Sequence, residues 1–245
     1  MGAGDGVCDG ARAMDRTTTA APMHWTVPEG DGPFPGLLLF HEAFGVNAHI
    51  ADVAARLAAQ GYVVGAPSLF ARLGADTLDY AQHDEAVALV SRLTTDDVLA
   101  DARSAHEQLA ARPDVDPDRI GAVGFCFGGR CAFLAATDLD LAAAASFYGP
   151  GIAAPGPDGP LARADRLRAP VLFVFGGLDP LIPDAARERI TTELDRFAKP
   201  HTIVTHPLAG HAFFNDARPD RYDPDAAAQA WTALLAFLAE HLGPR

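Results

Sequence analysis

The residue whose type and setting most suggest chemistry is Cys126, in the stretch Gly124-Phe-Cys-Phe-Gly128. An apolar run, 120–123, precedes this stretch and a helix-compatible run, 130–136, follows it, so the pattern predicts a strand, a tight turn and a helix. A cysteine at such a turn lies at the N-terminus of the next helix, where free N–H groups and the helix dipole favour a thiolate. The stretch therefore predicts a nucleophile. A glycine-rich turn around a buried structural cysteine is the alternative that the motif alone leaves open.

Two polar side chains that follow predicted strands can supply what a cysteine nucleophile needs. Asp179 comes just after a buried strand ending at Phe175, and His211 follows a strand ending near Thr205. Taken singly, they are better explained as a turn aspartate and a loop histidine. Taken together, they follow Cys126 in the order nucleophile, acid, histidine that the α/β-hydrolase fold requires. We expect His211 to take or stabilise the thiol proton and Asp179 to orient the imidazole. Other histidines lack this setting and are interpreted as surface or helix-packing residues, among them His83, His106 and His241.

The elements that must position these side chains alternate along the chain. Apolar runs predict strands, and three- and four-residue periodicity predicts helices. The strands are expected at 23–27, 36–40, 62–66, 142–148, 170–175 and 201–205, and the helices at 47–60, 79–93, 96–111, 183–197 and 225–242. Such alternation indicates an α/β fold with a mostly parallel central sheet, helices on both faces, and functional residues at the carboxyl ends of the strands.

Length and composition fit one folded domain. A chain of 245 residues can form a single α/β domain, and we expect residues 1–18 to be a flexible lead-in and residues 19–245 to form that domain. With 49% hydrophobic and 21% charged residues, the composition is that of a folded globular protein, and no apolar run is long enough to cross a membrane. The first residues show no secretory signal pattern, so a cytoplasmic location is expected.

Charge and cysteine usage narrow the classes of partner. The formal net charge is −13, and no cluster of Lys or Arg reverses it locally, so nucleic acid is not expected as a partner. The three cysteines, Cys8, Cys126 and Cys131, are odd in number and lack metal-type spacing. We expect reduced thiols and no metal site.

At this point the chain resembles the dienelactone hydrolase family, a cysteine-nucleophile branch of the α/β-hydrolases. The resemblance extends from about residue 20 to the C-terminal helix, and the combination of motifs is specific although no single stretch is. The matching stretches are His41-Glu-Ala-Phe-Gly-Val-Asn47, Gly61-Tyr62, Pro67-Ser-Leu-Phe-Ala-Arg72, Gly124-Phe-Cys-Phe-Gly-Gly129, Phe147-Tyr-Gly149, Gly176-Gly-Leu-Asp179 and Ala209-Gly-His211.

The resemblance implies roles for further residues. Glu42 matches the family glutamate that interacts with the resting thiol and takes part in forming the thiolate, although a strand-end carboxylate in a salt bridge is the plain alternative. The N–H groups of Ala43 and Phe127 would form the oxyanion hole. Phe44 and Tyr148 would line the substrate pocket, and both could equally be core aromatics. The resemblance implies no cofactor.

The chain departs from the family where a substrate carboxylate is usually held. Asn215 stands where the resemblance implies an arginine after the catalytic histidine, and no arginine lies between residues 72 and 92. A buried carboxylate without a cationic partner is costly, so either Arg72 or Arg218 serves instead or the substrate is neutral. We expect the neutral substrate, because structural pairing or exposure explains both arginines. Phe214 adds bulk near the expected pocket and favours a compact substrate.

The sequence thus predicts a hydrolase that opens a small lactone or activated ester through a Cys-His-Asp triad and an acyl-cysteine. A small-molecule substrate is the expected partner, and the expected state is a monomer or weak homodimer. A generalist carboxylesterase or thioesterase acting on a neutral substrate is the first alternative. The second is a ligand-binding or thiol-redox module in which Cys126 oxidises and Cys131 resolves the sulfenic acid, although a residue five positions along a helix points away from the turn.

Overall fold

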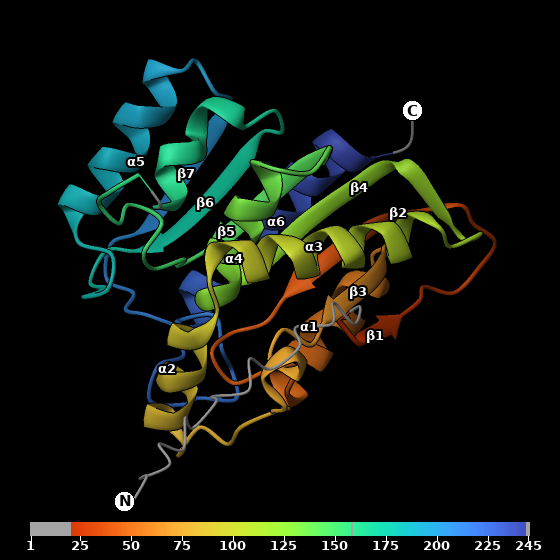
Figure 1. The fold of residues 1–245 in the computed structure, drawn as a ribbon, viewed down its shortest axis with the longest axis horizontal. Coiled ribbons are helices and arrows are strands. Elements are labelled where there is room, and N and C mark those ends of the chain that lie inside the picture. The colour runs from red at the N-terminus through yellow and green to blue at the C-terminus, as the bar shows by residue number, and fades with distance from the viewer. Residues whose placement is uncertain (1–20, 158, 244–245) are drawn as a thin grey trace, which may run out of the picture.

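A computed structural model describes residues 21–157 and 159–243, and these residues form one layered α/β structure (Figure 1). The predicted lead-in, residues 1–18, lies outside the described residues. The seven strands follow the order β1-β3-β2-β4-β5-β6-β7 across one sheet, with β1 antiparallel to β3 and every other neighbouring pair parallel. The strands are β1 (Met23–Thr26), β2 (Phe34–Phe40), β3 (Val63–Pro67), β4 (Val115–Phe125), β5 (Ala143–Phe147), β6 (Val171–Gly176) and β7 (His201–His206).

Helices cover both faces of this sheet. In Figure 1, α3 and α4 lie in front of the strands and α6 lies behind them. Helix α1 is on the side of α6, because the Arg56 guanidinium of α1 lies 5.4 Å from the ring centre of Trp231 in α6. The α-helices are α1 (Ala48–Ala58), α2 (His83–Arg92), α3 (Thr95–Ala110), α4 (Phe127–Ala136), α5 (Asp184–Arg196) and α6 (Pro224–Leu242), and two short 3-10 helices are η1 (Ala71–Leu73) and η2 (Pro160–Arg166). The predicted mostly parallel sheet with helices on both faces is confirmed.

Local sequence signals explain where several helices begin. The Asn47 side chain accepts a hydrogen bond from the Ile50 N–H at 3.2 Å and caps α1. Thr94 and Asp97 form a reciprocal capping box at the start of α3. The helix expected at 79–93 begins only at His83, and the Gln82 side chain before it makes no capping bond.

Strand β4 is longer than its apolar pattern indicated. The sequence pointed to an apolar run at 120–123, but β4 starts at Val115 and includes polar residues whose side chains are partly exposed. This extension pairs Val115 with Phe34 of β2, and a register shift between Pro35 and Gly36 separates it from the main pairing. Because the partly or fully exposed residues 116–119 separate Val115 from the apolar run, hydrophobic periodicity did not reveal this extension.

Two glycines allow the end of β4, the start of α4 and the end of β2 to approach closely. A Cβ on Gly124 would lie 1.9 Å from the Gly128 carbonyl oxygen, and a Cβ on Gly128 would lie 2.1 Å from the Phe40 carbonyl oxygen. No side chain fits at either position. This close approach brings the turn that carries Cys126 to the carboxyl edge of the sheet.

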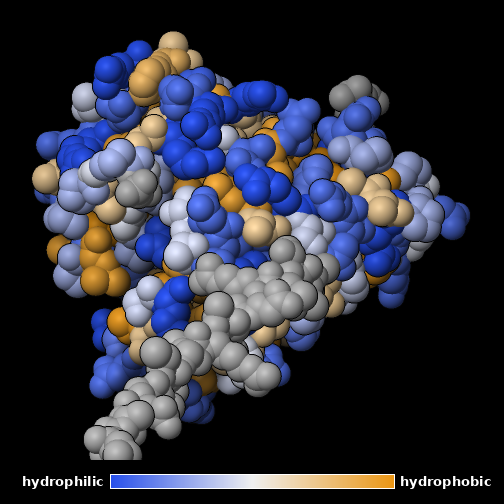
Figure 2. Space-filling view, in the orientation of Figure 1, coloured by the Kyte–Doolittle hydropathy of each residue, from blue (hydrophilic) through white to orange (hydrophobic). Residues whose placement is uncertain are grey.

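None of the helices in residues 21–157 and 159–243 combines the length and apolar character that crossing a bilayer demands. In Figure 2, polar residues cover most of the visible face, and the hydrophobic patches between them are small and separate.

Candidate active site

Cys126 occupies a strained turn between β4 and α4. Its backbone has φ 53° and ψ −119°, a positive-φ conformation that non-glycine residues rarely adopt. Its N–H donates to the Phe147 carbonyl of β5 at 3.0 Å, which fixes the turn to the sheet. Helix α4 starts at the next residue, Phe127, so Cys126 occupies the N-cap position of that helix.

His211 lies between Cys126 and Asp179. Its Nε2 atom is 3.1 Å from the Cys126 sulfur, and its Nδ1 atom is 2.7 Å from Oδ2 of Asp179. Asp179 is only 3% exposed, and its other carboxylate oxygen accepts from the Leu181 N–H at 2.8 Å. The loops after β6 and β7 thus bring together the three side chains that are far apart in the sequence, in the geometry of a nucleophile, a base and an orienting acid.

Opposing effects act on the pKa of the His211 imidazole. Burial lowers its pKa, but the hydrogen bonds to Asp179 and Cys126 and the negative charges of both raise the pKa from 6.5 to about 10. The balance favours a protonated imidazole at neutral pH. A cationic His211 beside the sulfur is the partner that a thiolate needs.

Glu42, two residues after the end of β2, points its carboxylate into a buried polar cluster. It is 1% exposed, and it accepts a hydrogen bond from Asn215 Nδ2 at 2.6 Å and one from the Tyr148 hydroxyl at 3.3 Å. Burial raises the pKa of Tyr148 well above its usual value, and the neighbouring Glu42 and Cys126 raise it further. Tyr148 is therefore a neutral donor to the carboxylate.

A small cavity opens onto Cys126. Its volume is about 180 Å³, which is less than that of pockets for drug-sized ligands and suits a compact molecule. Ala43 and Phe127, whose N–H groups were predicted to form an oxyanion hole, both line this cavity. The complete lining is Glu42, Ala43, Phe44, His83, Val87, Val90, Cys126, Phe127, Arg130, Pro150, Leu181, His211, Ala212 and Arg218.

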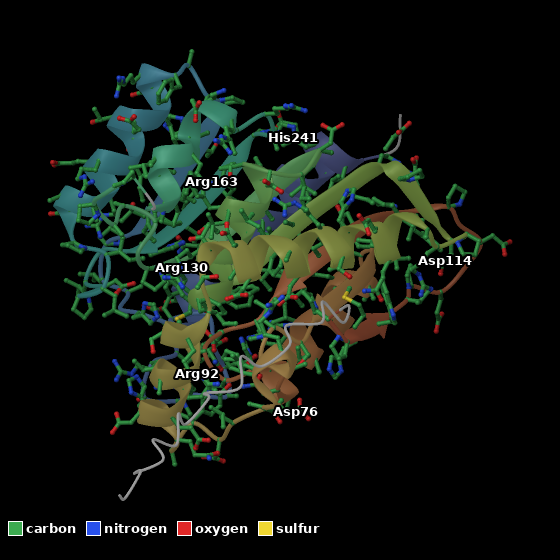
Figure 3. The ribbon with its side chains drawn as sticks, viewed as in Figure 1. Asp76, Arg92, Asp114, Arg130, Arg163 and His241 are labelled. Atoms are coloured by element: carbon green, nitrogen blue, oxygen red, sulfur yellow. The ribbon has the colours of Figure 1, made fainter. Side chains whose placement is uncertain are left out.

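Two arginines line the cavity without a carboxylate partner in the part of the chain that the structure describes. Arg130 lies over the Phe127 ring at 5.2 Å, and Arg218 lies over the rings of Phe44 and Tyr80 at 5.7 and 5.3 Å. Figure 3 shows Arg130 left of the centre of the molecule, above α2 and far from Asp114 at the right end. The two guanidinium groups are positive charges at the cavity of a chain whose net charge is −13.

Three residues predicted to line the substrate pocket lie elsewhere. Arg72 is not at the cavity, because its guanidinium bonds Asp101 at 2.9 and 2.7 Å and Asp97 at 2.7 Å. The hydrogen bond to Asp101 raises the pKa of Arg72, so this arginine is a structural cation. Tyr148 and Phe214 are buried behind the cavity wall, where they are 0% and 2% exposed.

The premise of the expected neutral substrate does not hold for this lining. That expectation depended on the absence of an arginine near the nucleophile, whereas Arg130 and Arg218 both lie there. The sequence contained a signal for Arg130 that was missed: it is four residues after Cys126, so one helical turn returns it to the same side as the thiol. His83, interpreted as a surface or packing residue, is exposed yet also borders the cavity.

The environment of Cys131 does not suit a thiol that would resolve an oxidised Cys126. Cys131 is fully buried in α4, and burial raises the pKa of its thiol to about 12. A thiol in that state is a poor resolving partner for an oxidised Cys126. In residues 21–157 and 159–243, no group of three or more His, Cys, Asp or Glu side chains is arranged to hold a metal ion.

Comparison with known sequences gives one consistent result. The profile of the dienelactone hydrolase family matches residues 23–242. A Synechocystis protein that carries the provisional name carboxymethylenebutenolidase is 35% identical over 222 residues, which cover 88% of this chain and 89% of that protein. A protein from Yersinia pestis with the same provisional name is 38% identical over 216 residues, covering 86% and 79% of the two chains.

Comparison with solved structures agrees. A Klebsiella pneumoniae protein provisionally described as a dienelactone hydrolase has a TM-score of 0.81 and 33% sequence identity, over 90% of this chain and 93% of its own. A dienelactone hydrolase-like promiscuous phosphotriesterase from metagenomic libraries has a TM-score of 0.80 at 28% identity, over 90% and 92% of the two chains. The predicted α/β-hydrolase fold is confirmed.

Proposed function

This chain belongs to the dienelactone hydrolase family, whose members hydrolyse ester or lactone bonds, and on that premise we propose that it opens a small, carboxylate-bearing lactone or activated ester through an acyl-cysteine on Cys126. The observation that carries this proposal is the position of His211 between the sulfur of Cys126, at 3.1 Å, and the carboxylate of Asp179, at 2.7 Å.

The proposed first half-reaction forms the acyl-enzyme. The Cys126 thiolate attacks the carbonyl carbon of the substrate, and the carbonyl oxygen gains the negative charge. The N–H groups of Ala43 and Phe127 receive this oxyanion at the cavity wall. The tetrahedral adduct collapses by breaking the bond to the leaving oxygen, which takes the proton of the His211 imidazolium. In a lactone, this oxygen stays attached to the acyl group, so the ring opens while the product is still bound to sulfur.

The proposed second half-reaction releases the product. His211, now neutral, accepts a proton from water, and the resulting hydroxide attacks the thioester carbonyl. The adduct collapses with Cys126 leaving as the thiolate and His211 again protonated. Asp179 keeps the same ring nitrogen directed at the sulfur throughout, and Glu42 controls the protonation of the thiol before substrate arrives.

Sulfur as the nucleophile restricts the substrate class. A thiolate is a better leaving group than an amine, so a tetrahedral adduct formed from an amide tends to collapse back to the starting amide. Enol lactones and activated esters proceed because their own leaving oxygen is stabilised. Proteolytic or amidase activity is therefore not expected, even though the nucleophile, base and acid would be correctly placed for it.

The arginines extend the proposal to a charged substrate. Arg130 reaches the cavity from the first turns of α4, and Arg218 reaches it from the loop after His211. Each can donate two hydrogen bonds to one carboxylate. Because the cavity is small, a carboxylate held by either arginine lies within a few bonds of the carbonyl attacked by Cys126.

Initial rates on two substrates test this function. A dienelactone, which carries a carboxylate, is compared with a neutral activated aryl ester, and Cys126→Ala is the blank. We expect saturable turnover of the dienelactone, none with Cys126→Ala, and a strong loss with Glu42→Gln. Turnover of the neutral ester alone would remove the anionic substrate from the proposal and favour a general carboxylesterase. Normal activity of Cys126→Ala would refute the mechanism.

A further inference from the structure

The shorter of the two side-chain hydrogen bonds that Glu42 accepts comes from Asn215. The proposed reaction gives Asn215 no role. Its side chain is 0% exposed, and its amide nitrogen lies 2.6 Å from Oε2 of Glu42 and 3.0 Å from the Tyr80 hydroxyl. Its amide oxygen accepts from the Ala217 N–H at 3.1 Å. Every polar atom of this buried amide therefore has a partner, which fixes the orientation of the group.

We propose that Asn215 is a positioning residue that holds the Glu42 carboxylate in place beside the nucleophile and thereby leaves Arg218 free to bind the substrate anion. This inference rests on the proposed function, since it assigns a task to a group that supports the same site. Asn215 is not in contact with the Cys126 sulfur or the His211 ring among the hydrogen bonds of the described residues, and its effect on the reaction passes through Glu42.

The neutral groups that donate hydrogen bonds to Glu42 support these separate roles for Asn215 and Arg218. Asn215 and Tyr148, which donate to Glu42, are both neutral, and no cationic side chain pairs with Glu42 among the described residues. A buried carboxylate satisfied by neutral donors needs no guanidinium. Arg218 lies nearby, over the Tyr80 ring at 5.3 Å, yet it makes no ion pair with Glu42. Its charge is therefore available to a ligand.

The hydrogen bonds of Asn215 also join three loops around the cavity. The Tyr80 hydroxyl receives a hydrogen bond from Asn47 at 3.2 Å as well as from Asn215, and its ring packs edge-on against Phe44 with the ring centres 4.8 Å apart. Asn47 and Phe44 follow β2, Tyr80 precedes α2, and Asn215 follows β7. The amide thus fixes Glu42 relative to the wall that carries Phe44 and Arg218.

A double-mutant cycle tests whether Asn215 acts through Glu42. The enzymes are the wild type, Asn215→Leu, Glu42→Ala and the double variant, and kcat/KM for the dienelactone is measured for each. We expect Asn215→Leu to lower kcat/KM by about 10- to 100-fold, the range for losing one hydrogen bond to a charged group. In the Glu42→Ala background, the same substitution should change kcat/KM less than about twofold, because the group on which it acts is already gone.

A second variant and a neighbouring control separate positioning from simple loss of folding. Asn215→Asp keeps the acceptor oxygen for the Ala217 N–H but replaces the donor to Glu42, and we expect a loss of kcat/KM at least as large as for Asn215→Leu. Asp216→Asn changes the adjacent residue, whose carboxylate is 3.2 Å from His49. This control should retain kcat/KM within about threefold if the effect depends on the contact with Glu42 and not on the loop as a whole.

The rate of alkylation of Cys126 by iodoacetamide at pH 7, followed by mass spectrometry of the Cys126 peptide, gives a readout that needs no turnover. We expect Asn215→Leu to change this alkylation rate by at least about threefold. In the Glu42→Ala background, the same substitution should leave the alkylation rate unchanged. If the wild type hydrolyses neither substrate, the proposed function fails, and the alkylation cycle still decides the role of Asn215. An unchanged rate in Asn215→Leu, or effects of the two substitutions that multiply, would overturn the positioning role.

Discussion

Replacing Asp179 by Asn changes one charge beside His211 and leaves the shape of the site almost intact. Asp179 is 3% exposed, its Oδ2 atom is 2.7 Å from Nδ1 of His211, and its Oδ1 atom accepts from the Leu181 N–H at 2.8 Å. An asparagine that keeps the bond from Leu181 presents an NH₂ group to the imidazole. The imidazole must then use Nδ1 as an acceptor, which directs the wrong tautomer at Cys126.

The expected magnitude follows from the geometry. At about 4 Å between the two charge centres and an effective dielectric constant of about 20, the attraction between carboxylate and imidazolium is about 4 kcal/mol. This energy corresponds to about three pKa units, or about a thousandfold in rate. It is of the same order as the rise in the pKa of His211 from 6.5 to about 10, to which Cys126 also contributes. We therefore expect Asp179→Asn to lower kcat/KM by about 10³-fold.

The assay compares initial rates of ester hydrolysis by the wild type, Asp179→Asn and Asp184→Asn. The last variant makes the same change in net charge at a carboxylate whose side chain is 82% exposed, and its activity should match that of the wild type. The pH at which hydrolysis is half-maximal should also shift in Asp179→Asn alone. If Asp179→Asn retains kcat/KM within threefold of the wild type while remaining folded, the assignment of Asp179 as the orienting acid is wrong.

Three further predictions concern substrate charge, stability and pH. Arg218→Gln and Arg130→Gln should each raise the KM of a carboxylate-bearing ester by about tenfold and leave the KM of a neutral ester unchanged, which steady-state kinetics will measure; equal effects on both substrates would contradict an anion site. Gly128→Ala should lower the free energy of unfolding by about 3 kcal/mol or more, because its Cβ would lie 2.1 Å from a carbonyl oxygen of β2. The control Gly210→Ala, whose Cβ would have no atom within 4 Å, should lower it by less than about 0.5 kcal/mol. Urea unfolding measures both values, and similar losses for the two variants would show that the turn can adapt. The pKa of His211 is raised from 6.5 to about 10 on folding, so its contribution to stability is complete below about pH 6.5 and is lost as the pH rises through 10. The Tm of the wild type should therefore fall over this pH range more steeply than the Tm of His211→Asn. Parallel Tm curves for the two proteins would exclude this contribution.

The candidate nucleophile and its partners were predictable because each has a local signature. Cys126 is framed by glycines at fixed spacing, and Asp179 and His211 each follow an apolar strand. The end of a buried parallel strand can be recognised from the residues around it, and parallel strands align their carboxyl ends at one edge. The order and type of these residues were therefore sufficient to predict that they meet, and the structure brings the three side chains into contact.

The lining of the cavity was not predictable in the same way. Arg72 ends a stretch that matches the family, yet its side chain bonds Asp97 and Asp101 of α3, and only the packing of that helix against η1 decides this. Arg218 lies in an irregular loop, where no periodicity indicates the direction of a side chain. Whether a long, flexible cation pairs with a carboxylate or remains free depends on contacts between segments distant in sequence.

The sequence by itself determined the alternation of strands and helices, the sharp turn at Cys126 and the order of nucleophile, acid and histidine, because these depend on periodicity and on glycines within a few residues. Only the tertiary structure decided that Glu42 is held by Asn215 and Tyr148, that Phe214 is buried behind the cavity, and that Arg130 and Arg218 face it unpaired. The physical reason is that burial and pairing of a side chain depend on every element that surrounds it, whereas the backbone conformation of a turn depends mainly on its own residues.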